Sequence, residues 1–476
     1  MTANARRRMI IAMHILFALM VVAAAPPVAQ VADAEAIAWL ELPQANASAE
    51  ALAQSRFADL FEAVFPKRML RALKGATKSQ VLAAAFKSAS PGEAEATVWI
   101  EAGKAEPAIT AALVDWLGAM GAKQASRSAG GLTLTPVQLR GRVITVFSGQ
   151  GRSGWSTQVQ RAERALTRSP APLDDDPAYV QLLRRTTKAD ARGRINVPRL
   201  WGMVARSQQA SKWIPMIERL GLEHLAAVEV QSRLLDKTSV ALEVQLTLPR
   251  PWRHLLASLG PPIAHTEPAV PKGARYARAS VRPGYLWSWL ERMASDKAPM
   301  ETALVRAQLD GIEKRLGSKL VEDALGEDPQ VWTVYQKAGA VVVEMGVKDA
   351  TLMGEFVKAY AAILPNLFPQ TQVKDTTIGK TQVIGVSGGG VGPISVAVLG
   401  DVLLVSSSAM ELEAHLGRRQ PVKEGPLGSE RLIAYGNNPD TKIQVPPLWH
   451  AVDVGVVGWR VSAESDRLIV DATVRK

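Results

Sequence analysis

The chain has 476 residues, of which 47% are hydrophobic and 21% charged, with a formal net charge of +11 and no cysteine. This apolar fraction excludes a disordered chain and predicts a buried core, and the length is enough for about two to four domains. The absence of cysteine excludes disulfide-stapled folds, cysteine nucleophiles, thiolate metal sites and lipid attachment to a cysteine.

The first 36 residues have the pattern of an export signal. Three arginines at positions 6–8 precede an apolar run over residues 9–25, and small residues with A-x-A spacing follow as far as Ala36. This order of basic, apolar and small-residue segments is typical of a secretory signal peptide. We therefore predict that residues 1–36 are removed and that the protein is extracytoplasmic, either periplasmic or secreted. An uncleaved anchor is the alternative, because about 17 apolar residues are the lower limit for crossing a bilayer.

The remainder of the chain contains five pairs of similar segments in the same order. The clearest pair is 194–201 (RINVPRLW) and 442–449 (KIQVPPLW), which agree at five of eight positions. In a second pair, 96–120 and 340–364, a strand-like stretch is followed by an amphipathic helical pattern. Collinear similarity of this kind predicts an internal duplication.

A proline-rich stretch separates the two copies. Residues 249–271 contain six prolines, and proline fixes φ and lacks an N–H donor, so an extended linker is predicted here. Lobe 1 then spans residues 37–248 and lobe 2 spans residues 272–476. Mixed strand and helix patterns with several hairpins predict an α+β fold. We expect two similar lobes, each a mostly antiparallel sheet with packed helices, and a ligand cleft between them.

Changes of spacing between paired segments predict two insertions. Pairing residues 141–146 with 400–405 gives lobe 2 about fifteen extra residues near 366–399, as a glycine-rich hairpin. In lobe 1, residues 202–221 are extra and have the pattern of a helix with Trp213 on its apolar side. We expect this inserted helix and the cleft to form the ligand region.

The repeated basic-Ile-x-Val-Pro-x-Leu-Trp motif is the most specific pattern in the chain. Its two tryptophans could line one shared groove, or each could fill the core of its own lobe. The candidate ligand or partner surface comprises Trp201, Trp449, Trp213, Arg194, Lys442 and Arg199.

No catalytic, metal or cofactor site is predicted. The histidines lack partners at metal-binding helical spacing, and the glycine-rich stretch 387–392 lacks the Lys-Ser/Thr ending of a phosphate loop and fits a hairpin tip. The acidic run that ends at Asp176 is explained by an N-cap in front of a helix that starts at Pro177.

The segment 396–416 (VAVLGDVLLVSSSAMELEAHL), the leader and the duplicated strand–helix unit together resemble uncharacterised bacterial extracytoplasmic proteins of a domain-of-unknown-function type. The resemblance covers most of the chain after the leader, and its motifs are structural. It implies export and a duplicated α+β fold. It brings no activity and no catalytic residues.

These features predict an exported, non-enzymatic envelope or secreted binding module with its ligand or partner surface between the lobes. The alternatives are an extracytoplasmic hydrolase whose site assembles only in three dimensions and an architectural envelope subunit. Removal of residues 1–36 leaves 53 basic and 43 acidic residues, a net charge of +10. This charge favours an anionic lipid or a cell-envelope polymer as partner, and no nucleic-acid-binding module is present. Contact with the membrane is expected to be peripheral or through an uncleaved anchor, and the oligomeric state stays open.

Overall fold

The computed structural model describes residues 32–475 with internal gaps. The gaps are residues 56–66, 77–78, 88–93, 140, 168, 205–209, 264–269, 272, 389–390, 419–431, 446–449 and 465. Residues 1–31, which hold most of the expected leader, lie outside the described residues. In the described part of the chain, no helix is both long and apolar enough to span a membrane.

The first half of the chain alternates short helices with strands. Its strands are β1 (Ala38–Leu42), β2 (Gln80–Lys87), β3 (Ala94–Glu101), β4 (Ala122–Lys123), β5 (Arg127–Ala129), β6 (Leu132–Leu139), β7 (Arg142–Gly149), β8 (Arg152–Ser156), β9 (Ala191–Asn196), β10 (Ala227–Leu234) and β11 (Ser239–Thr247). Its helices are α3 (Ala45–Ala53), α5 (Lys67–Lys74), η1 (Gly103–Ala105), α6 (Glu106–Gly118), α7 (Val159–Glu163), η2 (Leu173–Asp175), α8 (Pro177–Arg185), α9 (Val197–Val204) and α10 (Ala210–Leu220).

The second half has fewer and longer helices. A short helix, α11 (His254–Ala257), lies in the proline-rich connector between the halves. The later helices are α12 (Pro283–Lys297), α13 (Pro299–Leu316), the π-helix η3 (Leu320–Leu325), α14 (Ala350–Leu367) and α15 (Ala409–Arg418). The strands are β12 (Arg275–Val281), β13 (Gln330–Lys337), β14 (Ala340–Gly346), β15 (Gln372–Ile378), β16 (Thr381–Gly388), β17 (Val391–Leu399), β18 (Val402–Ser406), β19 (Leu432–Val445), β20 (His450–Ala463) and β21 (Arg467–Arg475).

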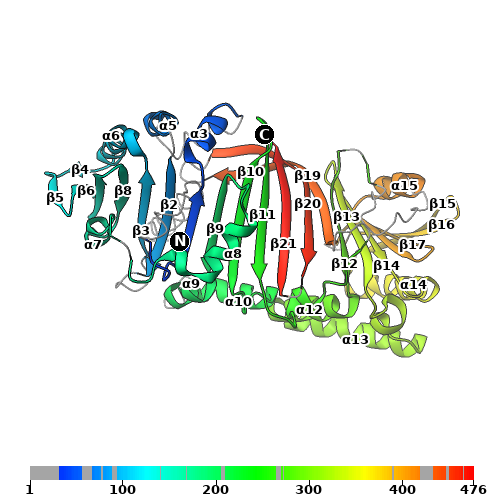
Figure 1. Cartoon of the computed structure of the whole chain (residues 1–476). Coiled ribbons are helices and arrows are strands. Elements are labelled where there is room, and N and C mark those ends of the chain that lie inside the picture. The colour runs from blue at the N-terminus through cyan, green and yellow to red at the C-terminus, as the bar shows by residue number, and fades with distance from the viewer. Residues whose placement is uncertain are drawn as a thin grey trace.

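All these strands belong to one continuous antiparallel sheet (Figure 1). From one end the pairings run β6–β7–β8–β3–β2–β1–β9–β10–β11, with β4 and β5 both paired to β6. Strand β11 then pairs with β21, and the sheet continues β20–β19–β12–β13–β14–β18–β17–β16–β15. The predicted α+β class is confirmed, whereas the two separate sheets that we expected are one sheet.

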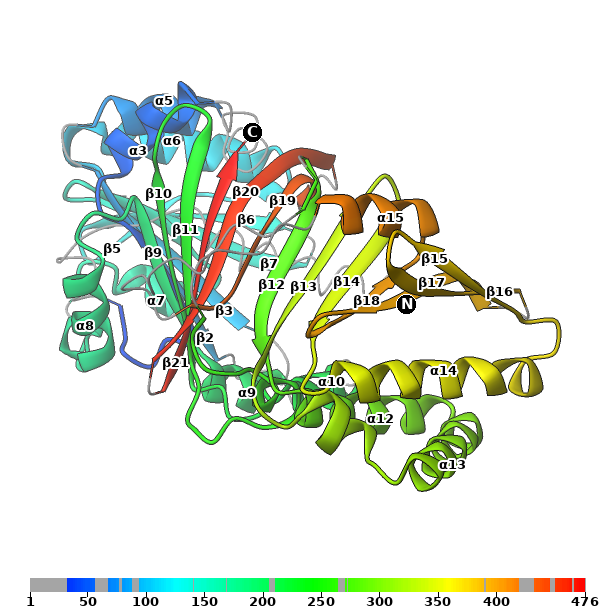
Figure 2. The ribbon, with the colours of Figure 1, turned by 90° about the vertical axis from the view of Figure 1, so that its right-hand side faces the viewer.

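Helices cover the sheet on both faces (Figure 2). On the face that we call the α8 face, α7 and α8 pack on Trp39, Leu82 and Trp99, and α15 packs on Leu404. On the opposite face, the α6 face, α3, α5 and α6 pack on Leu40 and its neighbours, and α14 packs on the second half. Successive residues of a strand point to opposite faces, so each strand contributes to both layers of core.

The start of the described chain is part of the first half. Ala32 is fully buried, and its carbonyl accepts a hydrogen bond from the Leu173 amide at 2.7 Å. The Asp33 carboxylate accepts hydrogen bonds from Arg161 and Ser169, and Ala36 is 5% exposed. The sequence pattern places these residues in the leader, but in the structure they belong to the folded first half.

The predicted insertion near residues 366–399 is wrong. Strand β8 pairs with β3 and β7, and β18 holds the same position in the second half because it pairs with β14 and β17. Matching residues 141–146 with 400–405 aligns β7 with β18, which is one strand out of step. Successive strands of a hairpin series have the same alternating pattern, so the sequence alone does not distinguish them.

Candidate functional site

The two halves meet along β11 and β21, which are each nine residues long. Ser239 at the start of β11 is opposite Arg475 at the end of β21, and Thr247 is opposite Arg467. The middle residues, Glu243 and Asp471, therefore lie opposite each other. The junction is symmetric about this pair in the pairing register, so equivalent positions of the two strands are brought together at its centre.

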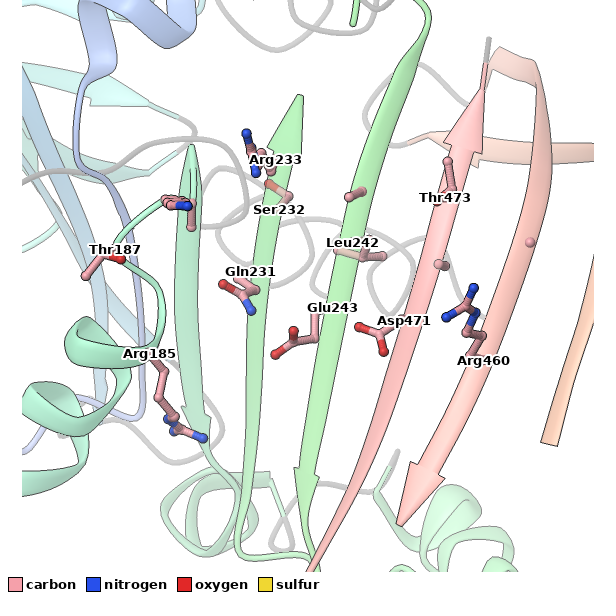
Figure 3. Close-up of a pocket in the computed structure, with 15 residues that line it drawn as sticks. Arg185, Thr187, Gln231, Ser232, Arg233, Leu242, Glu243, Arg460, Asp471 and Thr473 are labelled. Atoms are coloured by element: carbon pink, nitrogen blue, oxygen red, sulfur yellow. The ribbon is translucent and has the colours of Figure 1, made fainter. Parts of the chain in front are cut away.

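A pocket of 610 Å³ lies over this junction. It is lined by β10, β11, β20, β21 and the segment that joins α8 to β9 (Figure 3). The hollow arises where short side chains follow one another across the sheet, because Ala241 is opposite Thr473 and Thr473 is opposite Gly458. Both halves of the chain therefore build the pocket.

A row of charged and amide side chains, which we call the charged row, borders the hollow. It lies two residues along each strand from the short side chains. Gln231 is opposite Glu243, Glu243 is opposite Asp471, and Asp471 is opposite Arg460. Figure 3 shows these four side chains on the same side of the sheet. The Cβ atoms of directly opposed residues lie about 4.5–5.5 Å apart. Two carboxylates thus stand side by side, with an amide on one flank and a guanidinium on the other.

Hydrogen bonds from the first half hold Glu243 in place. The Gln245 side-chain amide donates to Glu243 Oε1 at 2.6 Å, and Arg185 Nη1 donates to Gln245 Oε1 at 2.6 Å. Arg185 Nη2 also donates to Glu229 at 2.6 Å, and Arg194 forms a second ion pair with Glu229, whose side chain is 4% exposed. Charge-assisted bonds of this kind fix side-chain position, so this wall of the pocket is preorganised.

A buried ion pair lies further from the junction, under α8. Arg192 donates to both oxygens of Glu41, at 2.7 and 2.9 Å, and the Glu41 side chain is fully buried. Tyr179 of α8 packs edge-on to Trp39 with the ring centroids 4.8 Å apart. Burial raises the pKa of the Tyr179 hydroxyl far above its ordinary value, and the negative charge of Glu41 adds to the effect. This hydroxyl therefore stays neutral.

The rim of the pocket is basic. Lys188 and Arg233 are exposed, and neither forms an ion pair with a carboxylate among the described residues. With Arg185 and Arg460, four basic side chains line the pocket against the carboxylates of Glu243 and Asp471. Such a lining can bind an anionic group at the rim, while the carboxylate pair accepts hydrogen bonds from hydroxyl or ammonium groups.

No metal centre is built by the described residues, because they contain no cluster of three or more His, Cys, Asp or Glu side chains suited to an ion. Among the histidines whose burial the structure describes, His415 is the most buried, at 2% exposed. Its Nε2 atom lies 3.3 Å from Glu344 Oε2, and its ring lies 5.5 Å from that of Tyr335. It is a packed residue between α15 and the sheet rather than part of the junction pocket.

The structure describes the side chains of three of the six residues predicted as a ligand or partner surface, Arg194, Arg199 and Trp201. Arg194 is engaged with Glu229, and Arg199 donates to the backbone carbonyls of Ala34 and Ala36 at 2.5 and 3.2 Å. Trp201 is half-buried in α9. Lys442 lies in β19, Trp213 lies in α10 with its side chain outside the described residues, and Trp449 lies outside them entirely.

Both copies of this motif begin at the end of a strand, since residues 194–196 end β9 and residues 442–445 end β19. In the first copy, helix α9 begins at Val197 directly after β9. Residues 446–449 of the second copy lie outside the described residues. Other arginines of the stretch 184–199 pair inside the fold, Arg185 with Glu229 and Arg192 with Glu41.

Sequence reasoning missed the junction residues, although one signal pointed to them. Residues 222–248 and 452–474 both have the pattern of two alternating strands around a charged turn, at Asp236 and Asp466, and these turns lead into β11 and β21. That the aligned strands pair with each other could not be deduced from the pattern. In comparisons with known proteins, no family model, curated protein or solved structure matches this chain.

Proposed function

We propose that the protein is an exported binding module that holds a polar ligand in the pocket at the β11–β21 junction. The observation that carries this proposal is the pocket itself: both halves line it, its floor is made of short side chains, and its charged row is held by hydrogen bonds. Binding sites are typically concave with a few convergent polar groups. This pocket has those properties at the place where the halves join.

We infer further that the two halves arose by duplication. The order of pairing from β6 to β11 has a counterpart from β16 to β21, with β1, β9 and β10 matched by β12, β19 and β20. The symmetric register of β11 against β21 supports the same inference. A junction built from equivalent strands explains why two carboxylates meet at its centre.

Export is part of the proposal, with a revised boundary for the leader. Because Ala32 and Asp33 are bonded into the first half, we expect cleavage upstream of Ala32, within the small-residue stretch after the apolar run, rather than after Ala36. Sequencing the N-terminus of the protein recovered from outside the cytoplasm tests this. A mature N-terminus at Ile37 would contradict the revised boundary.

The lining favours a cell-envelope polymer over a lipid at this pocket. The side chains are mainly charged, amide and hydroxyl groups, and a strand of hydroxylated sugars with ionic substituents can bond to both the rim and the carboxylate pair. With Asp33 and Glu35 retained, the mature chain has 53 basic and 45 acidic residues, and its net charge of +8 would attract an anionic polymer as well.

Binding of purified envelope polysaccharide fragments, measured by calorimetry on the exported full chain, tests the function. We expect Lys188→Gln/Arg233→Gln to weaken binding at least tenfold. The matched control is Lys374→Gln/Lys380→Gln, which removes the same charge on β15 and the following turn and should bind as the wild type does. Equal loss in both double variants would show that only net charge matters and would overturn the pocket as the site.

The facing carboxylates favour a second candidate, a glycoside hydrolase. Retaining glycosidases place two carboxyl groups about 5–5.5 Å apart, and the opposed positions of Glu243 and Asp471 permit that separation. Release of reducing ends from the same fragments would support this function if Glu243→Gln and Asp471→Asn each abolished it. Binding of the fragments without their hydrolysis would support the binding module instead of the hydrolase.

A further inference from the structure

A second hollow, of 890 Å³, lies where the connector meets α12 and the ends of β19 and β20. Its lining differs from that of the junction pocket because most of the residues that contribute to it are of apolar types. The connector contributes Trp252, Leu256 and Leu259, and the strands contribute Ile433 and Ala463. Prolines complete the apolar lining at positions 251, 261 and 262. A cavity of a few hundred cubic ångströms with such walls is the usual size and character of a small-molecule site.

Two arginines stand at the edge of this apolar hollow. The Arg250 guanidinium lies 4.5 Å from the centre of the Trp252 ring, and that of Arg282 lies 5.9 Å from the Tyr285 ring. Arg250 also donates to the backbone carbonyl of Glu464 at 3.2 Å. In the part of the chain that the structure describes, neither guanidinium forms an ion pair with a carboxylate.

One carboxylate does belong to the lining, that of the exposed Glu464. The pocket edge therefore carries two positive charges against one negative charge. Stacking on an aromatic ring orients a guanidinium and leaves its N–H groups available to an anion. The charge at this edge is thus complementary to a single anionic head group.

The connector is fastened to the second half, so the hollow is preformed. The Gly260 amide donates to the Ser280 carbonyl at 2.9 Å, and the Arg282 amide donates to the Ser258 carbonyl at 2.6 Å. Leu259 and Val281 form an isolated antiparallel bridge between these bonds. Because both the floor and the Arg282 backbone are held by this short ladder, a ligand would meet a wall that needs little ordering.

We propose that this hollow binds an anionic amphiphile, a molecule with one carboxylate or phosphate head and an apolar tail. The tail would lie on Trp252, Leu256 and Leu259, and the head would accept hydrogen bonds from Arg250 and Arg282. This site goes beyond the proposed polymer-binding function, because it lies at a different place and more of its lining residues are of apolar types.

Calorimetry with decanoate below its micelle concentration tests the proposal on the exported full chain. The expected result is saturable binding of decanoate, with at least tenfold weaker binding of decyltrimethylammonium, which has the same tail and the opposite charge. The Arg250→Gln/Arg282→Gln variant should lose decanoate binding at least tenfold. Arg253→Gln is the matched control, since Arg253 is an exposed arginine of the same connector that does not line the hollow.

Further experiments distinguish a free amphiphile from a charged membrane surface as the ligand, and this hollow from the junction pocket as the site. Binding to phosphatidylglycerol vesicles without binding of monomeric decanoate would overturn the proposal, because it would show attraction to a charged surface rather than entry of a tail. Leu256→Asn should weaken decanoate binding while circular dichroism confirms an intact fold. Equal binding of both amphiphiles, or no effect of the double arginine variant, would also overturn it. Glu243→Gln/Asp471→Asn should leave decanoate binding unchanged, so failure here is distinguishable from failure of the junction pocket.

Discussion

The two halves follow the same strand order but fill their interiors differently. In the first half, Gly154 of β8 lies opposite Phe147, and an added Cβ at Gly154 would overlap the Phe147 ring and the Val98 carbonyl oxygen. In the second half, Leu404 of β18 holds the equivalent position opposite Ala397. Phe147 opposite Gly154 in the first half thus corresponds to Ala397 opposite Leu404 in the second half. Strand order thus depends on pairing and alternation, while volume can be redistributed between neighbours.

The halves also differ in their buried polar groups. The first half encloses a two-bonded ion pair, Arg192 with Glu41, under α8. Under α15, the second half places His415 against Glu344 and Tyr335, with a single Nε2–Oε2 approach of 3.3 Å. Of these two clusters, the one under α8 contains a fully buried carboxylate, that of Glu41. The comparison predicts that polar substitutions are costlier in the first half.

The largest effect is expected from Arg192→Met. The substitution leaves the Glu41 carboxylate charged, fully buried and without its partner, which should lower the free energy of unfolding by about 3–5 kcal/mol. Equilibrium unfolding in urea measures it. The double variant Glu41→Leu/Arg192→Leu should recover most of the loss, because no charge is left unpaired. A single variant as stable as the wild type would refute the difference between the halves.

The next largest effect is expected where the large and the small residue have changed places between the β7–β8 pair and the β17–β18 pair. Leu404→Ala removes a fully buried side chain and should cost about 2–5 kcal/mol through the cavity it leaves. Gly154→Ala should cost about 1–3 kcal/mol through overpacking. Phe147→Ala/Gly154→Leu copies the arrangement of the second half and should be more stable than Phe147→Ala alone. If it is less stable, the two positions are not interchangeable.

A smaller, pH-dependent effect is expected at α13, which belongs to the second half alone. Burial opposes ionisation of Glu313, but hydrogen bonds from Lys319 Nζ at 2.7 Å and the Leu320 amide at 3.0 Å lower its pKa overall. A lowered pKa stabilises the fold above the unfolded value of about 4.3, and this stabilisation is lost as the pH falls through the folded pKa.

Comparing melting temperatures at pH 7 and pH 3 tests this assignment. Between these values the melting temperature of the wild type should fall further than that of Glu313→Gln, which cannot ionise, by about 1 °C for each kcal/mol of stability lost. Glu322→Gln, an exposed position on η3, is the control and should follow the wild type. Identical pH dependence of all three proteins would contradict the assignment to Glu313.

The smallest effect is expected at the junction itself. Like charges directly opposite each other destabilise an antiparallel pair, so Glu243→Gln or Asp471→Asn should raise the free energy of unfolding by about 0.2–1 kcal/mol. The gain should shrink in high salt, which screens exposed charges. The same variants should weaken ligand binding, and stability and function would then oppose each other at this pair. A loss of stability in both variants would show that the carboxylates hold the junction together.

Local features of the fold could be predicted from the sequence. Asp176 caps α8, with its side chain accepting from the Ala178 amide at 2.9 Å and Pro177 at the first helical position, as the pattern indicated. The helix expected before residue 364 is α14, and the glycine-rich stretch joins two paired strands, β16 and β17. These features depend on residues that are close together in the chain.

The candidate site could not be predicted because its partners are distant in the chain. Glu243 and Asp471 lie opposite each other because β11 pairs with β21, and local sequence patterns do not show which strands pair. Arg192 and Glu41 form an ion pair although they are 151 positions apart in the chain. The motif that looked most specific, around Trp201 and Trp449, begins at the end of a strand in both copies but did not point to the junction pocket. Similarity between the halves therefore did not indicate which side chains would share a pocket.

Engineered cross-links across the junction test the central claim most directly, because the chain has no cysteine of its own. The pairs Leu242→Cys/Ala472→Cys and Ala241→Cys/Thr473→Cys occupy adjacent register positions, and one of them must be the closely spaced, non-hydrogen-bonded kind. We expect an intramolecular disulfide in at least one variant, and none in Val240→Cys/Val470→Cys, which is out of register. If neither in-register pair closes within a single chain, the halves do not meet through β11 and β21, and the shared pocket does not exist.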